Sequence, residues 1–462
     1  MIYGAFLLTC LIGWLLLPPS VKLAALPRLG LAFISGAFAI SLQMFAYDLA
    51  RIPWSRLSLL LPWLAAALCI VVRRREQIAW PAWSTPAWWQ LALPAVLLIP
   101  VLVWLPFERI MPLTSQSWDA WAIWLFKAKA FYLDGGIGPY LERGAEFANH
   151  PGYPLLVPLY STFLYVLHGG VADSAAKFLS PCFLFALWGV FYGIARRFAP
   201  PVTALAFTIM LGTLPMLNIG AFALAGYADT ALAAYMVAAA GFLSIWYRDG
   251  ESSDLAVASM MAAAAAWTKN EGQFFLVGLL LLGGVELLRR KASGREWVWF
   301  LASPVVTLAP WVIVRQAYGV EAAGFVPGSN FDAGLFGIAL QTLAGKAADI
   351  KLFSLTFFVM LGAAAFALKI HPPRAFWILP ALTLWHLSGA LLAYATGRND
   401  LAWWLGTSAD RILSQVAPLA LLSGAVVFGV AMEQFERNSS ETPGETDRRA
   451  PAQRGAKRRG AK

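Results

Sequence analysis

The chain has 462 residues, of which 59% are hydrophobic and only 13% are charged, and its formal net charge at pH 7 is +10. This share of charged side chains is too low for an ordinary soluble protein, so the composition indicates a membrane protein. Apolar runs of roughly 17–22 residues, enough to cross a hydrocarbon core ~30 Å thick, recur almost to the C-terminus. We count about thirteen such spans and predict an all-α polytopic membrane protein.

The first apolar run, residues 2–17, has neither a basic segment before it nor an A-x-A cleavage site. We therefore predict a retained span rather than a signal peptide. The three cysteines (Cys10, Cys69 and Cys182) fall inside apolar runs, so they indicate no disulfide framework and no metal site. The predicted spans are residues 2–17, 30–47, 57–72, 88–106, 173–195, 201–220, 228–247, 254–269, 272–288, 297–315, 350–369, 375–394 and 411–432.

The spans divide into an N-terminal group and a longer core. Residues 1–75 hold three N-terminal transmembrane helices, and residues 76–432 form the transmembrane core, with a large outer loop at 107–172. Residues 433–462 are polar and rich in Arg and Lys, which is typical of a disordered tail that anionic lipid headgroups attract.

Basic residues between the spans set the orientation. They alternate so that one face collects Arg196 with Arg197, Arg248, Arg289 with Arg290, and the basic tail. We assign that face to the cytoplasm of a bacterial cell, which puts the N-terminus outside and the C-terminus inside. The assignment requires that residues 150–168 do not cross, and their three prolines favour a helix lying at the membrane interface.

The outer loop begins with the stretch SQSWDAWAIWLFKAKA, residues 115–130. One interpretation is an amphipathic interfacial helix in which Trp118 and the neighbouring tryptophans lie in the headgroup belt and Ser117 or Asp119 caps the helix. Lys127 and Lys129 would then extend toward lipid phosphates. The other reading is a catalytic loop, with the same lysines as ligands of a phosphate.

Three further polar groups fall on the same predicted face. Asp229 lies at the start of one span, Lys269 and Glu271 interrupt an apolar stretch, and Arg411 begins the last span. Three of these residues could have purely local roles. Asp229 could cap its helix, and Lys269 and Glu271 could form an ion pair with each other at a hairpin turn. Charged groups are costly inside a span, by ~2.5–3.5 kcal/mol on insertion scales, so they lie at interfaces or line a cavity.

Polar groups so far apart in the sequence, at one depth and on one side, suggest a shared cavity that opens outward. Cations there stabilise the charge that develops on a departing lipid phosphate, a carboxylate accepts the proton of an incoming hydroxyl, and tryptophans stack on sugars. Glycosyl transfer from a polyprenyl-phosphate donor uses this set of groups. It needs one base rather than the paired carboxylates of glycosidases.

The order of motifs resembles the GT-C membrane glycosyltransferases, in the group of lipid A aminoarabinose transferases and protein O-mannosyltransferases. The matching motifs are the aspartate after a span, HPGYPLL (150–156), GYADTALA (226–233), TKNEG (268–272) and TSADR (407–411). The resemblance covers about residues 88–432. It implies an inverting glycosyltransferase at the outer face of the bacterial cytoplasmic membrane, and a GT-C-like core with interfacial helices in the first large outer loop.

The resemblance also implies roles for single residues. Asp119 matches the catalytic aspartate; Lys127, Lys129, Lys269 and Arg411 would hold the donor phosphate; Asp229, Glu271, His150, Tyr153 and Trp118 would bind acceptor or sugar. Gly152 departs from the second proline of the family's HPP motif, and three spans precede the catalytic loop where the family usually has one. We expect no metal site and no required cofactor, although the three carboxylates could hold a divalent ion if they meet. The expected partners are a polyprenyl-phosphate-linked sugar, a glycan, lipid or protein acceptor, and membrane lipids, without nucleic acid.

Two other classes remain open. A transporter or flippase of a lipid-linked or polar solute would carry charges midway along its spans and show inverted repeats. A non-catalytic membrane scaffold would use Asp119 only as a helix cap. The substitution Asp119→Asn separates these readings, because it removes activity only from the enzyme.

Overall fold

The computed structural model describes residues 2–73, 118–144, 150–218, 226–320, 330–370, 372–397 and 400–441. The regular structure within these ranges is entirely helical. Seven helical segments in them are long and apolar enough to cross a membrane: Ala25–Leu49, Asp173–Phe198, Asp229–Asp249, Asn270–Arg289, Gly294–Ala317, Arg374–Thr396 and Leu401–Phe435. The chain is therefore an all-α, multi-pass membrane protein.

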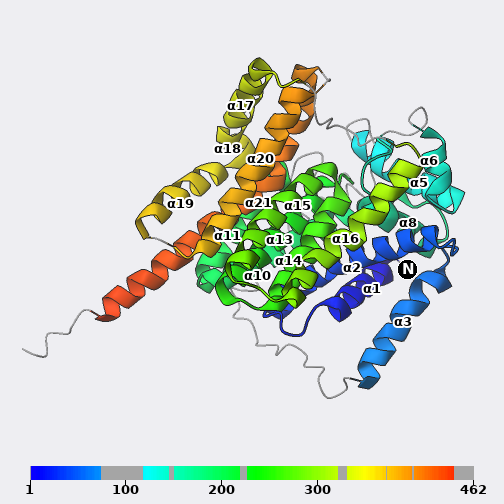
Figure 1. Ribbon diagram of the computed structural model, residues 1–462, viewed down its shortest axis with the longest axis horizontal. Helices are drawn as coiled ribbons and strands as arrows, with labels where there is room; N and C mark the ends of the chain where they lie inside the picture. Colours follow the sequence, from blue (N-terminus) through cyan, green and yellow to red (C-terminus); the bar gives the residue numbers. More distant parts are fainter. Residues whose placement is uncertain are drawn as a thin grey trace, which may run out of the picture.

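The helices fall into two halves along the chain (Figure 1). The first half contains α1 (Ile2–Leu16), α2 (Ala25–Leu49), α3 (Arg56–Arg73), the π-helical turn η2 (Ala120–Trp124), α5 (Leu125–Asp134), α6 (Gly138–Glu142), α8 (Leu156–His168), α9 (Asp173–Lys177), α10 (Leu179–Phe198), α11 (Pro201–Gly212) and α12 (Pro215–Asn218). The second half contains α13 (Asp229–Asp249), α14 (Ser252–Thr268), α15 (Asn270–Arg289), α16 (Gly294–Ala317), α17 (Ala333–Ala348), α18 (Ile350–Phe353), α19 (Thr356–Ile370), the 3-10 turn η3 (Arg374–Trp377), α20 (Ile378–Thr396) and α21 (Leu401–Glu441).

Helix α13 is the centre of the bundle (Figure 1). Residues 229–246 are all buried, and α13 contacts α10, α14, α15, α20 and α21. Its closest neighbour is α14, whose alanine run 262–266 is also fully buried. Small side chains let helices approach closely in a membrane, where packing rather than the hydrophobic effect drives association. The composition of these two helices therefore places the first residue of α13 deep inside the protein.

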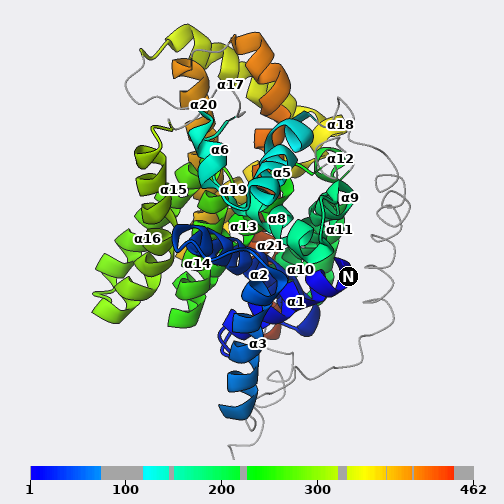
Figure 2. The same ribbon diagram turned by 90° about the vertical axis from the view of Figure 1, so that its right-hand side faces the viewer.

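The first two helices belong to this same body. Thr9 of α1 and Tyr160 of α8 share a hydrogen bond of 2.7 Å, and the hydroxyl of Tyr235 in α13 donates to the carbonyl oxygen of Ile34 in α2 at 2.8 Å. Helix α3 instead projects away from the body (Figure 2). Helices α1 and α2 therefore pack directly against helices of the predicted core.

Two predicted spans are broken by local chemistry. The span predicted at 201–220 ends with α11 at Gly212, and the short α12 begins at Pro215. Proline lacks an N–H and restricts the residue before it, so it starts a new helix more readily than it continues one. The span predicted at 350–369 is divided between α18 and α19 at Ser354, whose φ is +50°. None of the four helices α11, α12, α18 and α19 is long enough to be a candidate membrane span.

The last predicted loops and span also differ from the structure. The interval between the predicted spans 297–315 and 350–369 contains the helix α17, where the Asp332 side chain caps the N–H groups of Gly334 and Leu335. Helix α21 begins at Leu401 rather than at residue 411, because Asp400 accepts a hydrogen bond from the N–H of Trp403 at 2.8 Å. Arg411 thus lies inside a helix and not at its start.

The tail predicted from residue 433 is helical up to Glu441. Residues 432–436 (MEQFE) are good helix formers, and the Gln434 amide donates to the carbonyl of Ile370 at 3.2 Å, which ties the extension to α19. The predicted span 88–106 and residues 442–462 lie outside the described residues. Helix α8, predicted to lie at the interface, has 13 residues, or ~20 Å, which is short of a membrane crossing. It is nevertheless buried from Leu156 to Tyr165 rather than half exposed.

The predicted cytoplasmic arginines do meet at one end of the bundle. Arg197, at the end of α10, pairs with Asp249 at the end of α13, and the guanidinium of Arg290, at the end of α15, donates to the carbonyl of Tyr247 at 2.6 Å. Helix α13 therefore begins at the opposite end of the bundle, where Asp229 lies. The alternation of basic residues along the sequence predicts that Arg197, Arg248 and Arg290 lie at the same end of the bundle.

Candidate functional site

The site centres on five charged residues, here called the ionic cluster: Asp119, Asp229, Lys269, Glu271 and Arg411. They come from the segment before η2, the start of α13, the junction of α14 and α15, and α21. Asp229 is the most enclosed, with 2% of its side chain exposed. It does not act as a helix cap, since no side-chain capping bond forms at the start of α13. Its carboxylate instead receives two side chains from α21 and one from the α14–α15 hairpin.

Lys269 is held between two carboxylates. Its ammonium lies 3.0 Å from Oδ1 of Asp229 and 2.9 Å from Oε1 of Glu271. This lysine is the single extended residue between α14 and α15, with φ −151° and ψ 161°. Gly272 lets the two helices approach here, because a Cβ on it would lie 2.0 Å from the carbonyl oxygen of Ala265. The hairpin turn therefore delivers a buried cation to Asp229.

Arg411 bridges the two aspartates. Its Nε and Nη2 donate to Oδ2 of Asp229 at 3.1 and 2.9 Å, and Nη2 lies 2.7 Å from Oδ2 of Asp119. The ring of Tyr227 lies under the guanidinium, 4.9 Å from its carbon. Asp119 is in helical backbone and makes no capping bond, so the interpretation of it as a helix cap is wrong. The structure thus brings together Asp119, Asp229, Lys269, Glu271 and Arg411, as the sequence predicts.

Two buried polar residues that the sequence analysis missed complete the shell of Asp229. The Gln415 amide nitrogen donates to Oδ1 of Asp229 at 2.6 Å, and its amide oxygen lies 3.0 Å from Nε2 of His386. Since Gln415 donates to the carboxylate, its oxygen faces the imidazole, so His386 must carry its proton on Nε2. The sequence does carry one feature that points to Gln415 as a site residue: it is a polar residue one helical turn after Arg411 in an otherwise apolar span.

Next to the cluster lies an aromatic stack of Trp124, Tyr153 and His150. The Tyr153 ring stacks on both neighbours, with centroids 5.6 Å from Trp124 and 4.7 Å from His150. Lys127 is fully buried, with its ammonium 5.5 Å from the centre of the Tyr153 ring, and it donates to the backbone carbonyl of His150 at 2.7 Å. His150 has φ +50°, which is uncommon for a residue with a side chain. Burial, and then the charge of Lys127, lower the pKa of His150.

We expect the buried charge of Lys127 to make stability depend on pH. Burial lowers the pKa of Lys127 to about 7. The unfolded chain therefore holds this proton up to about pH 10.4 and the folded chain only to about 7. The wild type should gain stability relative to Lys127→Met as the pH rises through this window, by about 1.4 kcal/mol per pH unit, with no such gain below it. Apparent unfolding midpoints of both proteins measure the effect, with Lys129→Met as control; parallel curves would contradict it.

The remaining predicted site residues lie outside this arrangement. Lys129 forms an ion pair with Asp173 at 2.6 Å, and Asp173 also accepts from the hydroxyl of Tyr165 at 2.7 Å. Trp118 is 52% exposed and packs edge-to-face on Trp121. The structure therefore brings neither Lys129 nor Trp118 into contact with the ionic cluster.

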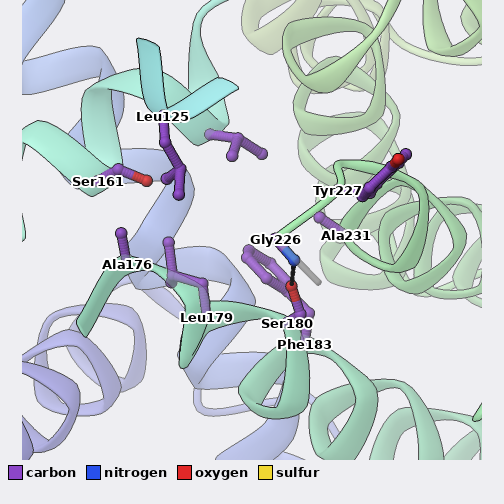
Figure 3. A pocket seen from close by; sticks show the side chains of 10 residues that line it. Leu125, Ser161, Ala176, Leu179, Ser180, Phe183, Gly226, Tyr227 and Ala231 are labelled. Atoms are coloured by element: carbon purple, nitrogen blue, oxygen red, sulfur yellow. Dashed lines mark hydrogen bonds between the residues drawn. The ribbon is translucent and has the colours of Figure 1, made fainter. Parts of the chain in front are cut away.

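A small cavity lies behind Tyr227 (Figure 3). Its wall is mostly apolar and is formed by Leu125, Val157, Ser161, Ala176, Leu179, Ser180, Phe183, Gly226, Tyr227 and Ala231. The N–H of Gly226 donates to the Ser180 hydroxyl at 3.1 Å across this wall, and the φ of +91° at Gly226 turns the chain into α13. The cavity is too small and too apolar for a sugar, so it is no part of the polar site.

No group of three or more His, Cys, Asp or Glu side chains is arranged to hold a metal within the part of the chain that the structure describes. The positions between the carboxylates are filled by side-chain cations. Arg411 lies between Asp119 and Asp229, and Lys269 lies between Asp229 and Glu271. These cations supply the positive charge that a divalent ion would bring to the same oxygens.

The fold and the site define a class: a helical, multi-pass membrane protein with a buried ionic cluster at one end of its bundle. Comparisons with family models, with curated proteins and with solved structures give no match to this chain. The function must therefore be argued from the cluster itself.

Proposed function

We propose that the protein is an inverting GT-C glycosyltransferase that moves a sugar from a polyprenyl-phosphate donor to an acceptor hydroxyl. The observation that carries the proposal is the guanidinium of Arg411, shared by one buried and one partly exposed carboxylate. A fixed cation beside a carboxylate with access to solvent provides the two functions that this transfer needs, an anion ligand and a base.

Of the four cations predicted to bind the phosphate of the sugar donor, Arg411 is the best suited. Lys127 and Lys269 are buried and engaged, and Lys129 is paired with Asp173. The guanidinium of Arg411 uses Nε and Nη2, whereas Nη1 has no acceptor among the described residues. Two parallel N–H groups of a guanidinium match two phosphate oxygens. Lys269 then acts by fixing Asp229 and by adding positive charge.

In the proposed reaction, the acceptor oxygen attacks the anomeric carbon of the sugar from the face opposite the phosphate. The new carbon–oxygen bond forms as the bond from the anomeric carbon to the phosphate oxygen breaks. The electron pair stays on the phosphate, where Arg411 stabilises it, and the acceptor proton passes to Asp119. The products are the glycosylated acceptor and the polyprenyl phosphate, with the anomeric configuration inverted. His150, the exposed ring at the end of the aromatic stack, presents a flat face on which a sugar ring can stack, and Tyr153 supports it from behind.

The proposal extends to architecture and location. It includes about thirteen membrane-spanning helices, of which seven candidates are seen among the described residues. It places the protein in the bacterial cytoplasmic membrane, with the N-terminus outside, the C-terminus in the cytoplasm and the ionic cluster at the outer face. The meeting of Arg197, Asp249 and Arg290 at the other end of the bundle supports this orientation through the positive-inside rule.

Binding of undecaprenyl phosphate to the purified protein in detergent tests the donor site. We expect Arg411→Ala to weaken binding on the order of a hundredfold, because it removes a charged partner of the phosphate. Arg411→Lys should recover only part of the affinity, since an ammonium lacks the planar fork. Lys346→Ala is the matched control, because Lys346 pairs with Asp410 beside Arg411.

The result separates the function classes. Equal affinity in the wild type and in Arg411→Ala would contradict the donor assignment. Mass spectrometry can detect whether the protein releases undecaprenyl phosphate from a bound hexose conjugate. If the conjugate binds but no undecaprenyl phosphate is released, the result would instead favour a transporter or flippase of the lipid-linked sugar.

A further inference from the structure

The ionic cluster has an excess of negative charge before any substrate binds. Its three carboxylates, Asp119, Asp229 and Glu271, face two permanent cations, Lys269 and Arg411, so its formal charge is −3 + 2 = −1. A phosphate that entered this arrangement unchanged would meet repulsion from the carboxylates. One carboxylate must therefore release its cation, or lose its charge, when an anion binds.

The two carboxylates on Arg411 differ in how firmly they are held. Asp229 accepts hydrogen bonds from Lys269, Gln415 and Arg411 and is 2% exposed. Asp119 contacts the cluster through one oxygen on Nη2 of Arg411, and 18% of its side chain is exposed. It also lies on the chain before η2 rather than within the bundle core. Asp119 is thus the carboxylate that can be displaced.

Arg411 keeps its position without Asp119. Two of its nitrogens bind Oδ2 of Asp229, and the ring of Tyr227 supports the face of the guanidinium. If Asp119 leaves, Nη2 regains one N–H next to the two unused N–H groups of Nη1. These groups form the edge of a guanidinium that binds two oxygens of a phosphate in parallel.

We propose that Asp119 occupies the phosphate site of Arg411 in the free protein and is displaced by the phosphate of the lipid donor. Binding of the donor and release of the base are then one exchange at a single guanidinium. The displaced carboxylate no longer shares its charge with Arg411, so it accepts the acceptor proton only when a donor is present. This inference rests on the proposed function for its catalytic meaning, but the exchange itself is a statement about anion binding.

The exchange makes an unusual prediction: the variant that lacks the base should bind the lipid phosphate more tightly. Asp119→Asn removes the competing charge from Arg411, and we expect its affinity for undecaprenyl phosphate to rise about tenfold, equivalent to about 1.4 kcal/mol. Inorganic phosphate as a second probe shows whether the gain belongs to the phosphate group or to the lipid. A gain with both probes assigns it to the phosphate, whereas a gain with the lipid alone overturns the exchange.

Asp410→Asn is the matched control. It removes a carboxylate from the neighbouring position, which pairs with Lys346 and not with Arg411, so its affinity should equal that of the wild type. Equal gains in both variants would indicate a general effect of charge and overturn the exchange. Asp119→Ala serves as a second variant if Asp119→Asn does not fold, and unchanged or weaker binding in the folded variant also overturns it.

The outcomes distinguish this inference from the proposed function. Tighter binding by Asp119→Asn, in a wild type that transfers no sugar, leaves the exchange standing and removes the glycosyltransferase. Sugar transfer by the wild type, with no gain of affinity in Asp119→Asn, leaves the enzyme standing and removes the exchange.

Discussion

Asp119→Asn is expected to reduce sugar transfer about a thousandfold while the protein remains folded. A positioned general base contributes typically 10²–10⁴ in rate, and an amide cannot accept the acceptor proton. The folded state should persist because Arg411 keeps its two hydrogen bonds to Asp229 when Asp119 loses its charge. The measurement is the initial rate of undecaprenyl phosphate release from an undecaprenyl-phosphate hexose, in the presence of cell-envelope material that supplies acceptor hydroxyls, beside an unfolding curve.

Asp410→Asn is again the informative comparison, because it should keep the wild-type rate. A rate that survives in Asp119→Asn would exclude Asp119 as the base. Loss of activity in both variants would point to the electrostatics of this end of the bundle as a whole.

Asp229→Ala should have the largest effect on stability, about 3–5 kcal/mol, because it takes from two buried cations the more deeply buried of the two carboxylates that each contacts. Lys269 is 5% exposed and Arg411 is 15% exposed, so neither can recover its hydration without rearrangement. Gln415 would also lose the acceptor of its amide. Chemical unfolding of the purified protein in detergent gives the free-energy difference.

A second variant tests the cause. Asp229→Ala combined with Lys269→Met removes one of the two cations that lose Asp229, and should recover part of the loss. If the double variant is less stable than Asp229→Ala, the cost arises from packing rather than from unpaired charge. Asp410→Asn, which breaks a partly exposed pair, should cost less than about 1 kcal/mol.

The sequence predicts the fold class and the convergence of the charged groups because both follow from strong physical constraints. Apolar runs of membrane length form helices, since backbone groups cannot remain unpaired in lipid. Charges within such runs are costly and must find partners. Alternating spans put Asp229, Lys269 and Arg411 at one end, and the structure joins them in one cluster.

Other features depend on contacts between distant segments, which one sequence does not display. The hydrophobic pattern of α21 gives no sign that Asp400 caps it eleven residues before Arg411. The pairing of Lys129 with Asp173 depends on how α5 and α9 approach each other. Gln415 and His386 are single polar residues in apolar runs, and their roles appear only when α20 lies beside α21.

The partners of Asp229 are separated by very different lengths of chain. Lys269 follows it after 40 residues and Arg411 only after 182. At a synthesis rate of about 5–20 residues per second, Arg411 leaves the ribosome roughly ten to forty seconds after Asp229. Once Lys269 has been made, it is the only one of these two cations that can pair with Asp229 for the rest of that interval. The short α14–α15 turn therefore protects the nascent chain until the last helix arrives to complete the site.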